Sequence, residues 1–323
     1  MRRYFRVLLL FGLLLAGPSG VSLAQSRSDW SHGATRYLII DFLDIGQGDS
    51  ILIRSPEGKT ALVDAGPTKD GATRLLKQKG ISAIDIVIVS HHHSDHYGGM
   101  EQVIRNFKPR YFMATGSSHT TKGYLRLLET VKSEGITAVE PTSKQRKIEL
   151  GSVNLTVFPQ PRYDHEEENN NSIGIRLDYG DFSALLTGDS ETEERDWWIG
   201  HNPTLIRECT VVKLAHHGSR NGTDQGWLEL VQPEIAVASV GAGNDYGHPH
   251  SETISLLRRN GIPLLRTDLR GTITIVSNGK TWNLVDPELA RRRGSRNGNA
   301  VATRSSEDES SVGGSFSSRA RRR

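Results

Sequence analysis

Short Val/Ile/Leu runs recur at regular intervals between residues 36 and 285, and they predict strands that alternate with helices. The first series of expected strands lies at 37–43, 50–54, 60–63 and 85–90, with helices at 72–79 and 121–134. The second series has strands at 153–158, 173–177, 182–186, 210–214, 235–240, 264–266, 272–276 and 281–285, with helices at 191–199, 224–231 and 252–259. Two groups of strands, each followed by helices, predict an α+β fold in which two sheets pack face to face with helices outside. No Pro- or Gly-rich linker divides this region, so residues 36–288 are expected to form one domain.

The N-terminus has the pattern of an export signal. Three arginines within the first six residues precede the apolar run Val7–Ala16, and Ser22 and Ala24 supply the small residues of a cleavage site. The sequence therefore predicts a signal peptide at residues 1–24, a short linker at 25–35 and a secreted or periplasmic product. A membrane anchor is disfavoured because the apolar run is shorter than the roughly 20 residues that a span requires.

The basic charge of the chain belongs to its two ends. Residues 289–323 are rich in Arg, Ser and Gly, with nine arginines against three acidic residues, and they predict a disordered tail. The signal peptide contributes +3, this tail contributes +6, and the whole chain carries +3, so the body between them carries −6. Global charge therefore gives no support for a body that binds nucleic acid, and no feature indicates a protein partner.

The strongest chemical signal is the segment SHHHSDHYGG, which directly follows an expected buried strand. It supplies His91, His93, Asp95 and His96, whose imidazole and carboxylate donors suit Zn²⁺, Mn²⁺ or Fe. Four such donors in six residues exceed what one ion takes from a single loop, so we expect two divalent ions, Zn or Mn. Asp95 is also the candidate to orient a catalytic water or accept its proton. His92 alternates away from His91 and His93 and is not expected to be a metal ligand.

Two later strands also end in residues that can bind a metal. Asp189 follows the strand at 182–186, where it could bridge two ions, although a Gly-Asp pair after a strand is ordinarily a turn. His216 and His217 follow the strand at 210–214. By analogy with His91, the first histidine after the strand is the preferred ligand, so His216 is chosen over His217. The single cysteine, Cys209, excludes a thiolate-rich site.

Three further residues have more than one interpretation. His248 and His250 precede an expected helix and could act as a ligand, as a proton donor to a leaving group, or as a phosphate contact. The alternative is a loop packed by Pro249. Asp64 ends the strand at 60–63 and could orient a ligand imidazole from behind, although turn chemistry explains it almost as well.

Over residues 36–285 the chain resembles metallo-β-lactamase-fold proteins, and in particular the catalytic domain of the ComEC family of DNA-uptake channel proteins. The resemblance rests on the ordered motifs DIGQGDSILI, LVDAG, SHHHSDHYGG, NNNSIGIRL, LLTGD, KLAHHGS and GHPHSETI. It implies a four-layer αββα sandwich with a dinuclear site at the sheet edges, in which Asp189 bridges and His216 or His217 completes the ligand set. Many superfamily members have a histidine ligand near positions 165–171. Here the segment ends in Asn171, which becomes an alternative ligand, and no membrane channel accompanies the domain.

The sequence thus predicts an exported metal-dependent hydrolase. The resemblance favours a phosphodiesterase or nuclease that acts on DNA or RNA. An amide or ester hydrolase of the β-lactamase or lactonase kind is the alternative. A non-catalytic module that binds nucleic acid is disfavoured by the intact metal motif.

Overall fold

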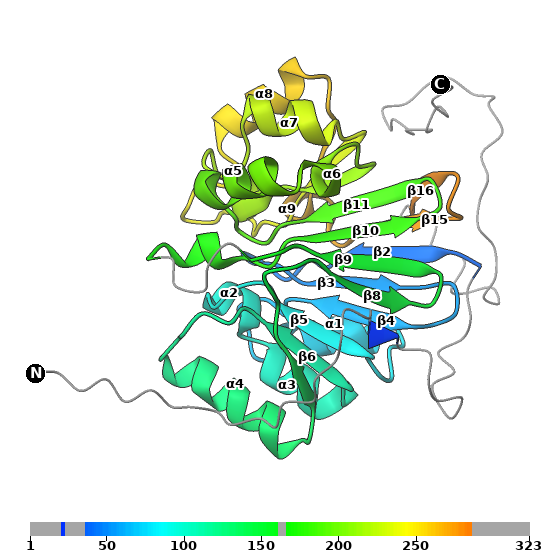
Figure 1. Cartoon of the computed structure of the whole chain (residues 1–323), viewed down its shortest axis with the longest axis vertical. Helices are drawn as coiled ribbons and strands as arrows, with labels where there is room; N and C mark the ends of the chain where they lie inside the picture. Colours follow the sequence, from blue (N-terminus) through cyan, green and yellow to red (C-terminus); the bar gives the residue numbers. More distant parts are fainter. Residues whose placement is uncertain (1–20, 23–35, 161–165, 286–323) are drawn as a thin grey trace, which may run out of the picture.

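The computed structural model describes residues 21–22, 36–160 and 166–285 (Figure 1). Apart from Val21–Ser22, the expected signal peptide and linker lie outside the described residues, as does the expected tail from residue 289 onward. These three expectations therefore remain predictions.

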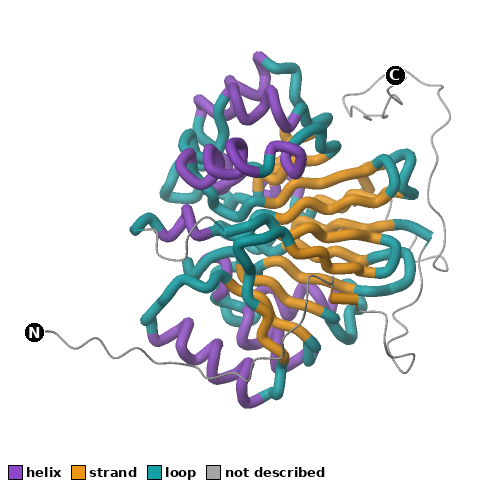
Figure 2. The backbone as a smooth tube through the Cα atoms, viewed as in Figure 1, coloured by secondary structure: helices purple, strands orange, loops and turns teal. Residues whose placement is uncertain are grey.

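Two sheets of eight strands each fill the middle of the described molecule (Figure 2). The first has the order β16 (Trp282–Val285), β15 (Ile273–Ser277), β2 (Leu38–Phe42), β3 (Ile51–Arg54), β4 (Thr60–Val63), β5 (Ile86–Val89), β6 (Tyr111–Ala114) and β7 (Thr137–Val139). The second has the order β1 (Val21–Ser22), β8 (Arg146–Leu150), β9 (Val153–Val157), β10 (Ile175–Tyr179), β11 (Phe182–Leu186), β12 (Val211–Lys213), β13 (Ile235–Ala238) and β14 (Leu264–Arg266). Both sheets are mixed: β4 to β7 and β11 to β14 run parallel within their sheets, and antiparallel pairs make up much of the rest.

Helices cover the outer face of each sheet (Figure 1). The first sheet is covered by α1 (Gly71–Gln78), α2 (Ser94–Tyr97), α3 (Met100–Phe107) and α4 (Lys122–Ser133). The second is covered by α5 (Thr192–His201), α6 (Pro203–Ile206), α7 (Gln225–Val231) and α8 (Ser251–Arg259). The short α9 (Thr267–Arg270) follows β14, and two 3₁₀ turns, η1 (Glu168–Asn171) and η2 (Ala215–Gly218), lie in loops. The structure therefore confirms the four-layer αββα sandwich.

Side-chain alternation explains why the strands are apolar on both faces. In β3, Ile51 and Ile53 face the core between the sheets, whereas Leu52 packs with the helices outside. In β11, Ala184 faces the central core and Leu185 packs under the helices. Because strands such as these bury both faces, their sequences read as nearly continuous apolar runs.

Helix α5 carries a buried carboxyl group next to the segment that holds η1. The backbone N–H of Glu194 donates to Asn170 Oδ1 at 3.3 Å, and the Glu194 side chain is fully buried. Burial raises the pKa of Glu194 well above its usual value, against a smaller lowering by the Ser172 backbone. The neutral acid therefore stabilises the fold at low pH, and this stabilisation is lost as pH rises from the unfolded pKa towards the folded one.

Replacing Glu194 by glutamine should remove this pH dependence. We expect Glu194→Gln and the wild type to unfold at similar temperatures near pH 4, where both side chains are neutral. At pH 8 the variant should be the more stable, because only the wild type must ionise or hold a buried proton. Thermal unfolding followed by circular dichroism from pH 4 to 9 measures this. Two curves that stay parallel over the whole range would contradict it.

Candidate metal centre

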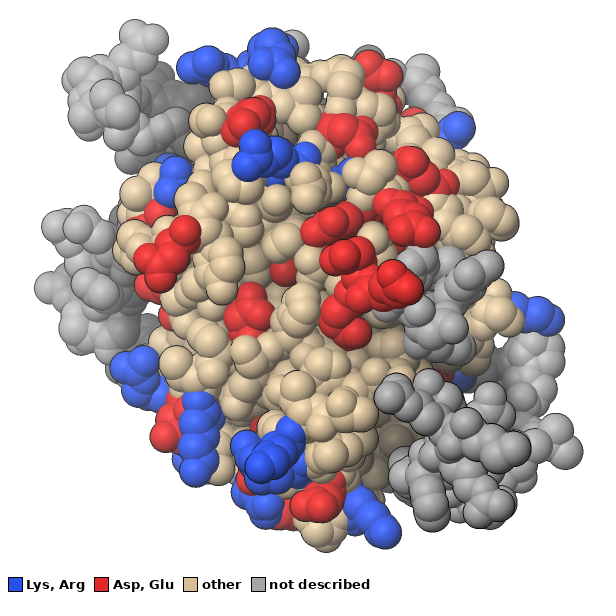
Figure 3. All heavy atoms as spheres, turned by 90° about the vertical axis from the view of Figure 1, so that its left-hand side faces the viewer, with Lys and Arg blue, Asp and Glu red and all other residues tan. Residues whose placement is uncertain are grey.

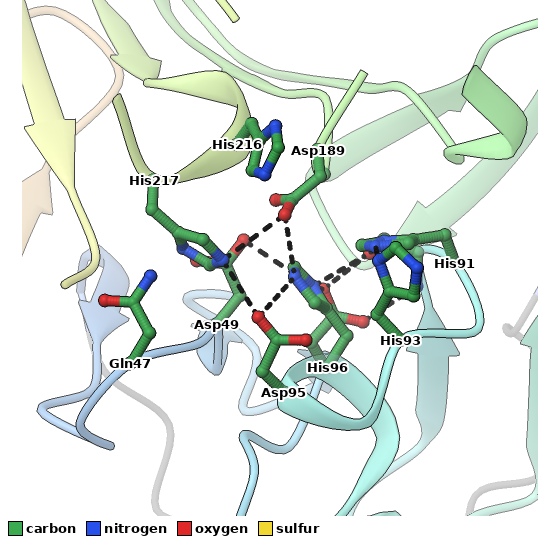
Figure 4. A network of polar contacts seen from close by, with 12 residues as sticks. Gln47, Asp49, His91, His93, Asp95, His96, Asp189, His216 and His217 are labelled. Carbon is green, nitrogen blue, oxygen red and sulfur yellow. Dashed lines mark hydrogen bonds and ion pairs between the residues drawn. The ribbon is translucent and has the colours of Figure 1, made fainter. Parts of the chain in front are cut away.

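The candidate ligands meet where parallel strands of the two sheets end. The segment that holds His91 and Asp95 follows β5 in one sheet, while Asp189 follows β11 and His217 follows β12 in the other. Because parallel strands direct their carboxyl ends to one edge of a sheet, the three loops converge there. Figure 4 shows these side chains pointing toward one another.

Four of these side chains form a compact group, which we call the Asp189 cluster. Asp95, His96, Asp189 and His217 each offer a ligand atom, and these atoms lie within 4.8 Å of one another. Oδ2 of Asp189 is 3.3 Å from Nε2 of His96 and 3.3 Å from Nε2 of His217. Oδ2 of Asp95 is 3.2 Å from Nε2 of His217. Ligands about 2.0–2.1 Å from a tetrahedral zinc ion are separated by roughly 3.3 Å, so the cluster has the dimensions of a metal shell.

The polar atoms of the cluster also fit a metal. Nε2 of His96 is buried and lies close to Oδ2 of Asp189 without the geometry of a hydrogen bond. Buried polar atoms of this kind normally have a hydrogen-bond partner or a ligand. A divalent cation shared by these atoms would satisfy them and would neutralise the two carboxylates.

Mutual electrostatics hold the cluster in charged form. Burial alone would raise the pKa of Asp189, but the imidazoles of His217 and His96 hold it well below the usual range. Burial likewise opposes the charge on His217, but Asp189 and Asp95 raise its pKa to about 9. The same balance, dominated by Asp189 and Asp64, raises the pKa of His96 well above normal. An imidazole must be deprotonated before it can bind a metal. An incoming cation would therefore displace protons from His96 and His217.

His91 and His93 form a pair beside this cluster. Nε2 of His91 lies 3.1 Å from Nδ1 of His93, and the ring centroids of His91 and His96 are 4.1 Å apart. Burial lowers the pKa of His91 well below normal, with a further contribution from His96, so its ring is neutral. Within the described residues, no Asp, Glu, His or Cys joins this pair as a third ligand at the spacing of the Asp189 cluster. Asn171, the alternative ligand expected from sequence, is buried in η1.

Asp64 occupies the position from which a carboxylate can orient His96. Its Oδ2 lies 2.8 Å from Nδ1 of His96 and accepts a hydrogen bond of 2.7 Å from the hydroxyl of Ser90. Its Oδ1 accepts the backbone N–H of Ser90 at 2.7 Å. This arrangement fixes the ring of His96 with Nε2 toward Asp189, as expected if Asp64 orients a ligand imidazole from behind.

The structure brings His217, and not His216, into the cluster. Nδ1 of His217 donates to the carbonyl of Ser239 at 2.9 Å, which leaves Nε2 facing Asp95 and Asp189. His216 instead contacts Oε1 of Glu191 through Nδ1 at 2.9 Å, and Figure 4 shows no contact from its ring to the cluster. Both histidines have left-handed backbone angles in η2, with φ of 48° and 54°. The chain has thus left the extended conformation before His216, so the analogy with His91 does not hold.

Lys213 and Asp49 are members of the site that the sequence analysis missed. The ammonium of Lys213 is fully buried, forms an ion pair with Asp49, and lies 3.5 Å from Oδ1 of Asp189. It also donates to the carbonyl of Gly188 at 3.1 Å. A lysine inside an otherwise apolar strand was the available signal, because a buried ammonium requires a nearby carboxylate.

A cavity of about 290 Å³ opens over the cluster and is lined in part by Asp95, Asp189, His217 and His248. Burial, with help from His216 and His217, lowers the pKa of His248 to about 4. His250 does not line this cavity. Its Nδ1 accepts the backbone N–H of Arg220 at 3.0 Å and its Nε2 donates to the Tyr246 carbonyl at 3.2 Å. The structure therefore separates the two histidines: His248 borders the site and His250 packs the loop.

Comparison with known proteins gives a family match and relatives. A family model described as the metallo-beta-lactamase superfamily matches residues 43–242. ComE operon protein 3 of Bacillus subtilis is 28% identical over 253 residues, which cover 72% of this chain and 32% of that protein. Competence protein ComA of Neisseria gonorrhoeae is 29% identical over 282 residues, covering 84% of this chain and 35% of that protein.

A more distant relative is an endoribonuclease. Endoribonuclease YSH1 of Yarrowia lipolytica is 27% identical over 172 residues, which cover 46% of this chain and 20% of that protein. The chain spans about a third of the length of the two competence-related proteins. Among the residues that the structure describes, no helix has the length and apolar character needed to cross a membrane.

Proposed function

The chain belongs to the metallo-β-lactamase superfamily and is related to the competence proteins of the ComEC family, and from this premise we propose that it is a metal-dependent phosphodiesterase acting on DNA or RNA. The observation that carries the proposal is the convergence of Asp95, His96, Asp189 and His217 from three loops onto a volume that fits a divalent cation. Buried imidazole and carboxylate side chains beside an open cavity are typical of hydrolytic metal centres.

We assign the ligands from this geometry. Asp95, His96 and His217 would hold one ion, and His91 with His93 would hold the other. Asp189, whose Oδ2 lies 3.3 Å from Nε2 of both His96 and His217, would be the carboxylate shared by the two ions. When bound, divalent cations supply a water of lowered pKa and neutralise the charge that accumulates during displacement at phosphorus. Zinc and manganese both suit this donor set.

Asp95, Lys213 and His248 would each have a separate role in hydrolysis. Asp95 is the half-buried member of the cluster and lies on the cavity, where it can orient a water or receive its proton. Lys213 adds a buried positive charge close to Asp189 and so assists His217 and His96 in keeping that carboxylate ionised. His248 borders the same cavity from the loop after β13, where its ring can contact the substrate.

The choice of a phosphodiester substrate rests on the relatives. The sequence resembles the catalytic domain of DNA-uptake proteins, and one of the more distant relatives is by name an endoribonuclease. The β-lactamase alternative shares the superfamily but has no comparable support among these relatives. The Arg-rich tail expected at 289–323 would add nonspecific attraction for a phosphate backbone. Export by the expected signal peptide stays a prediction.

A substrate and metal screen tests the proposed function. Purified protein should be assayed with Mn²⁺, Zn²⁺ and Mg²⁺ against single- and double-stranded DNA, RNA, bis(p-nitrophenyl) phosphate and nitrocefin. We expect turnover of the phosphodiesters with at least one metal, loss of turnover after chelation, and no hydrolysis of nitrocefin. Hydrolysis of nitrocefin or an ester with untouched phosphodiesters would support the alternative instead.

A further inference from the structure

A second group of metal-ligating side chains lies outside the Asp189 cluster. His92, His119 and Glu168 each present a ligand atom, and these atoms lie within 4.8 Å of one another. We propose that these three residues, here called the His92 site, bind an additional zinc ion that is distinct from the catalytic metals. The proposal concerns ion binding and loop structure, and it does not depend on the substrate of the enzyme.

The distances within the His92 site suit a shared ion. Nδ1 of His92 lies 3.1 Å from Oε1 of Glu168, which is close to the roughly 3.3 Å between two ligands of a tetrahedral zinc ion. The same oxygen accepts the backbone N–H of His92 at 3.0 Å, so the carboxylate is held in place. The ring of His119 lies 5.1 Å from the ring of His92, centroid to centroid.

The surroundings leave the His92 imidazole incompletely satisfied. The His92 side chain is buried, and its Nε2 has no hydrogen-bond partner among the described residues. Ser117 Oγ lies 3.2 Å from Nδ1. Because Nδ1 and not Nε2 faces Glu168, Nδ1 is the ring nitrogen that would bind the ion, in place of its contact with Ser117.

The site is open enough for an ion to enter. His119 and Glu168 are half-buried, so a water could complete the shell of two histidines and one glutamate. Glu166 and Glu167 are exposed immediately before Glu168. Figure 3 shows acidic side chains gathered on the face toward which this segment lies. Such a negative surface raises the local concentration of cations.

An ion at the His92 site would join three loops. His92 belongs to the segment of the catalytic motif, His119 to the loop between β6 and α4, and Glu168 to η1. The ion would thus fix the segment that carries His91 and His93 against the neighbouring loops, as a structural metal does.

Metal counting on variants tests the His92 site. Chelated protein is reconstituted with Zn²⁺, freed of excess metal and analysed by mass spectrometry. We expect His119→Ala to hold one zinc ion fewer per chain than the wild type, because it loses one of three ligands. Glu168→Gln should lose the same ion. The control is His201→Ala, since His201 lies in α5 stacked on Trp197 and outside every cluster named above. It should retain the full count.

A variant of the catalytic centre separates this inference from the proposed function. Asp189→Ala should still bind zinc at the His92 site, and adding His119→Ala should remove that remaining ion. Equal zinc content in the wild type, His119→Ala and Glu168→Gln would overturn the proposal, whether or not the protein hydrolyses phosphodiesters. Circular dichroism of each variant identifies any that fails to fold, and Glu168→Gln, which preserves side-chain shape, then decides.

Discussion

Replacing Asp189 by alanine should lower kcat/KM for a small phosphodiester by at least about a thousandfold, the upper range for loss of one electrostatic stabiliser. Its carboxylate lies 3.3 Å from two ligand imidazoles and 3.5 Å from the Lys213 ammonium. Its removal deletes the proposed bridge. It also leaves the buried positive charges of His96, His217 and Lys213 close together without the negative charge of Asp189. Steady-state kinetics with the reconstituted protein, together with metal analysis, measures both consequences.

Two companion variants make the Asp189 result interpretable. Asp189→Asn keeps the shape of the side chain but removes its charge, and it should also lose activity and metal. Asp196→Ala removes an exposed carboxylate of α5 and should leave the rate unchanged. Wild-type activity and metal content in Asp189→Ala would defeat the proposed centre.

The pair His217→Ala and His216→Ala should give opposite results. His217→Ala should lose metal and at least about a hundredfold in kcat/KM, because Nε2 of His217 faces Asp95 and Asp189. His216→Ala should retain its metal, since its ring contacts Glu191 instead. Both variants need the same assays, with thermal unfolding to compare their folded states.

One result of this comparison would contradict the positions of His216 and His217 in the structure. If His216→Ala loses metal while His217→Ala keeps it, then the η2 turn is rearranged when the ions bind. The preference for the first histidine after the strand would then be right for the metal-bound protein.

The architecture was predictable wherever a strand is buried on both faces. Runs such as Ile86–Val89 and Phe182–Leu186 are largely apolar and wholly buried, and they form β5 and β11 where expected. Strand β8, Arg146–Leu150, was not predicted, because it is polar at its exposed positions. Strand β7, Thr137–Val139, is short and largely exposed, and it also gave no apolar run.

The site was predictable only as far as residue order determines geometry. The motif from His91 to His96 is one short segment that runs from the end of β5 into α2, so its spacing alone brings its donors together. The choice between His216 and His217 depends on two left-handed backbone angles that the sequence pattern does not reveal. The ion pair between Lys213 and Asp49 joins different sheets, and no local pattern could indicate it.

The residues of the cluster belong to both sheets, so the ribosome synthesises some of them much later than others. Asp95 and His217 face each other across 122 positions of the chain, and Asp189 too follows long after the histidine-rich motif. A growing polypeptide that has exposed only the motif offers a metal an incomplete and solvent-exposed set of ligands. In the proposed centre an ion would find its full set of ligands only after the second half of the chain has emerged and docked, so acquisition of metal would be a late event of maturation.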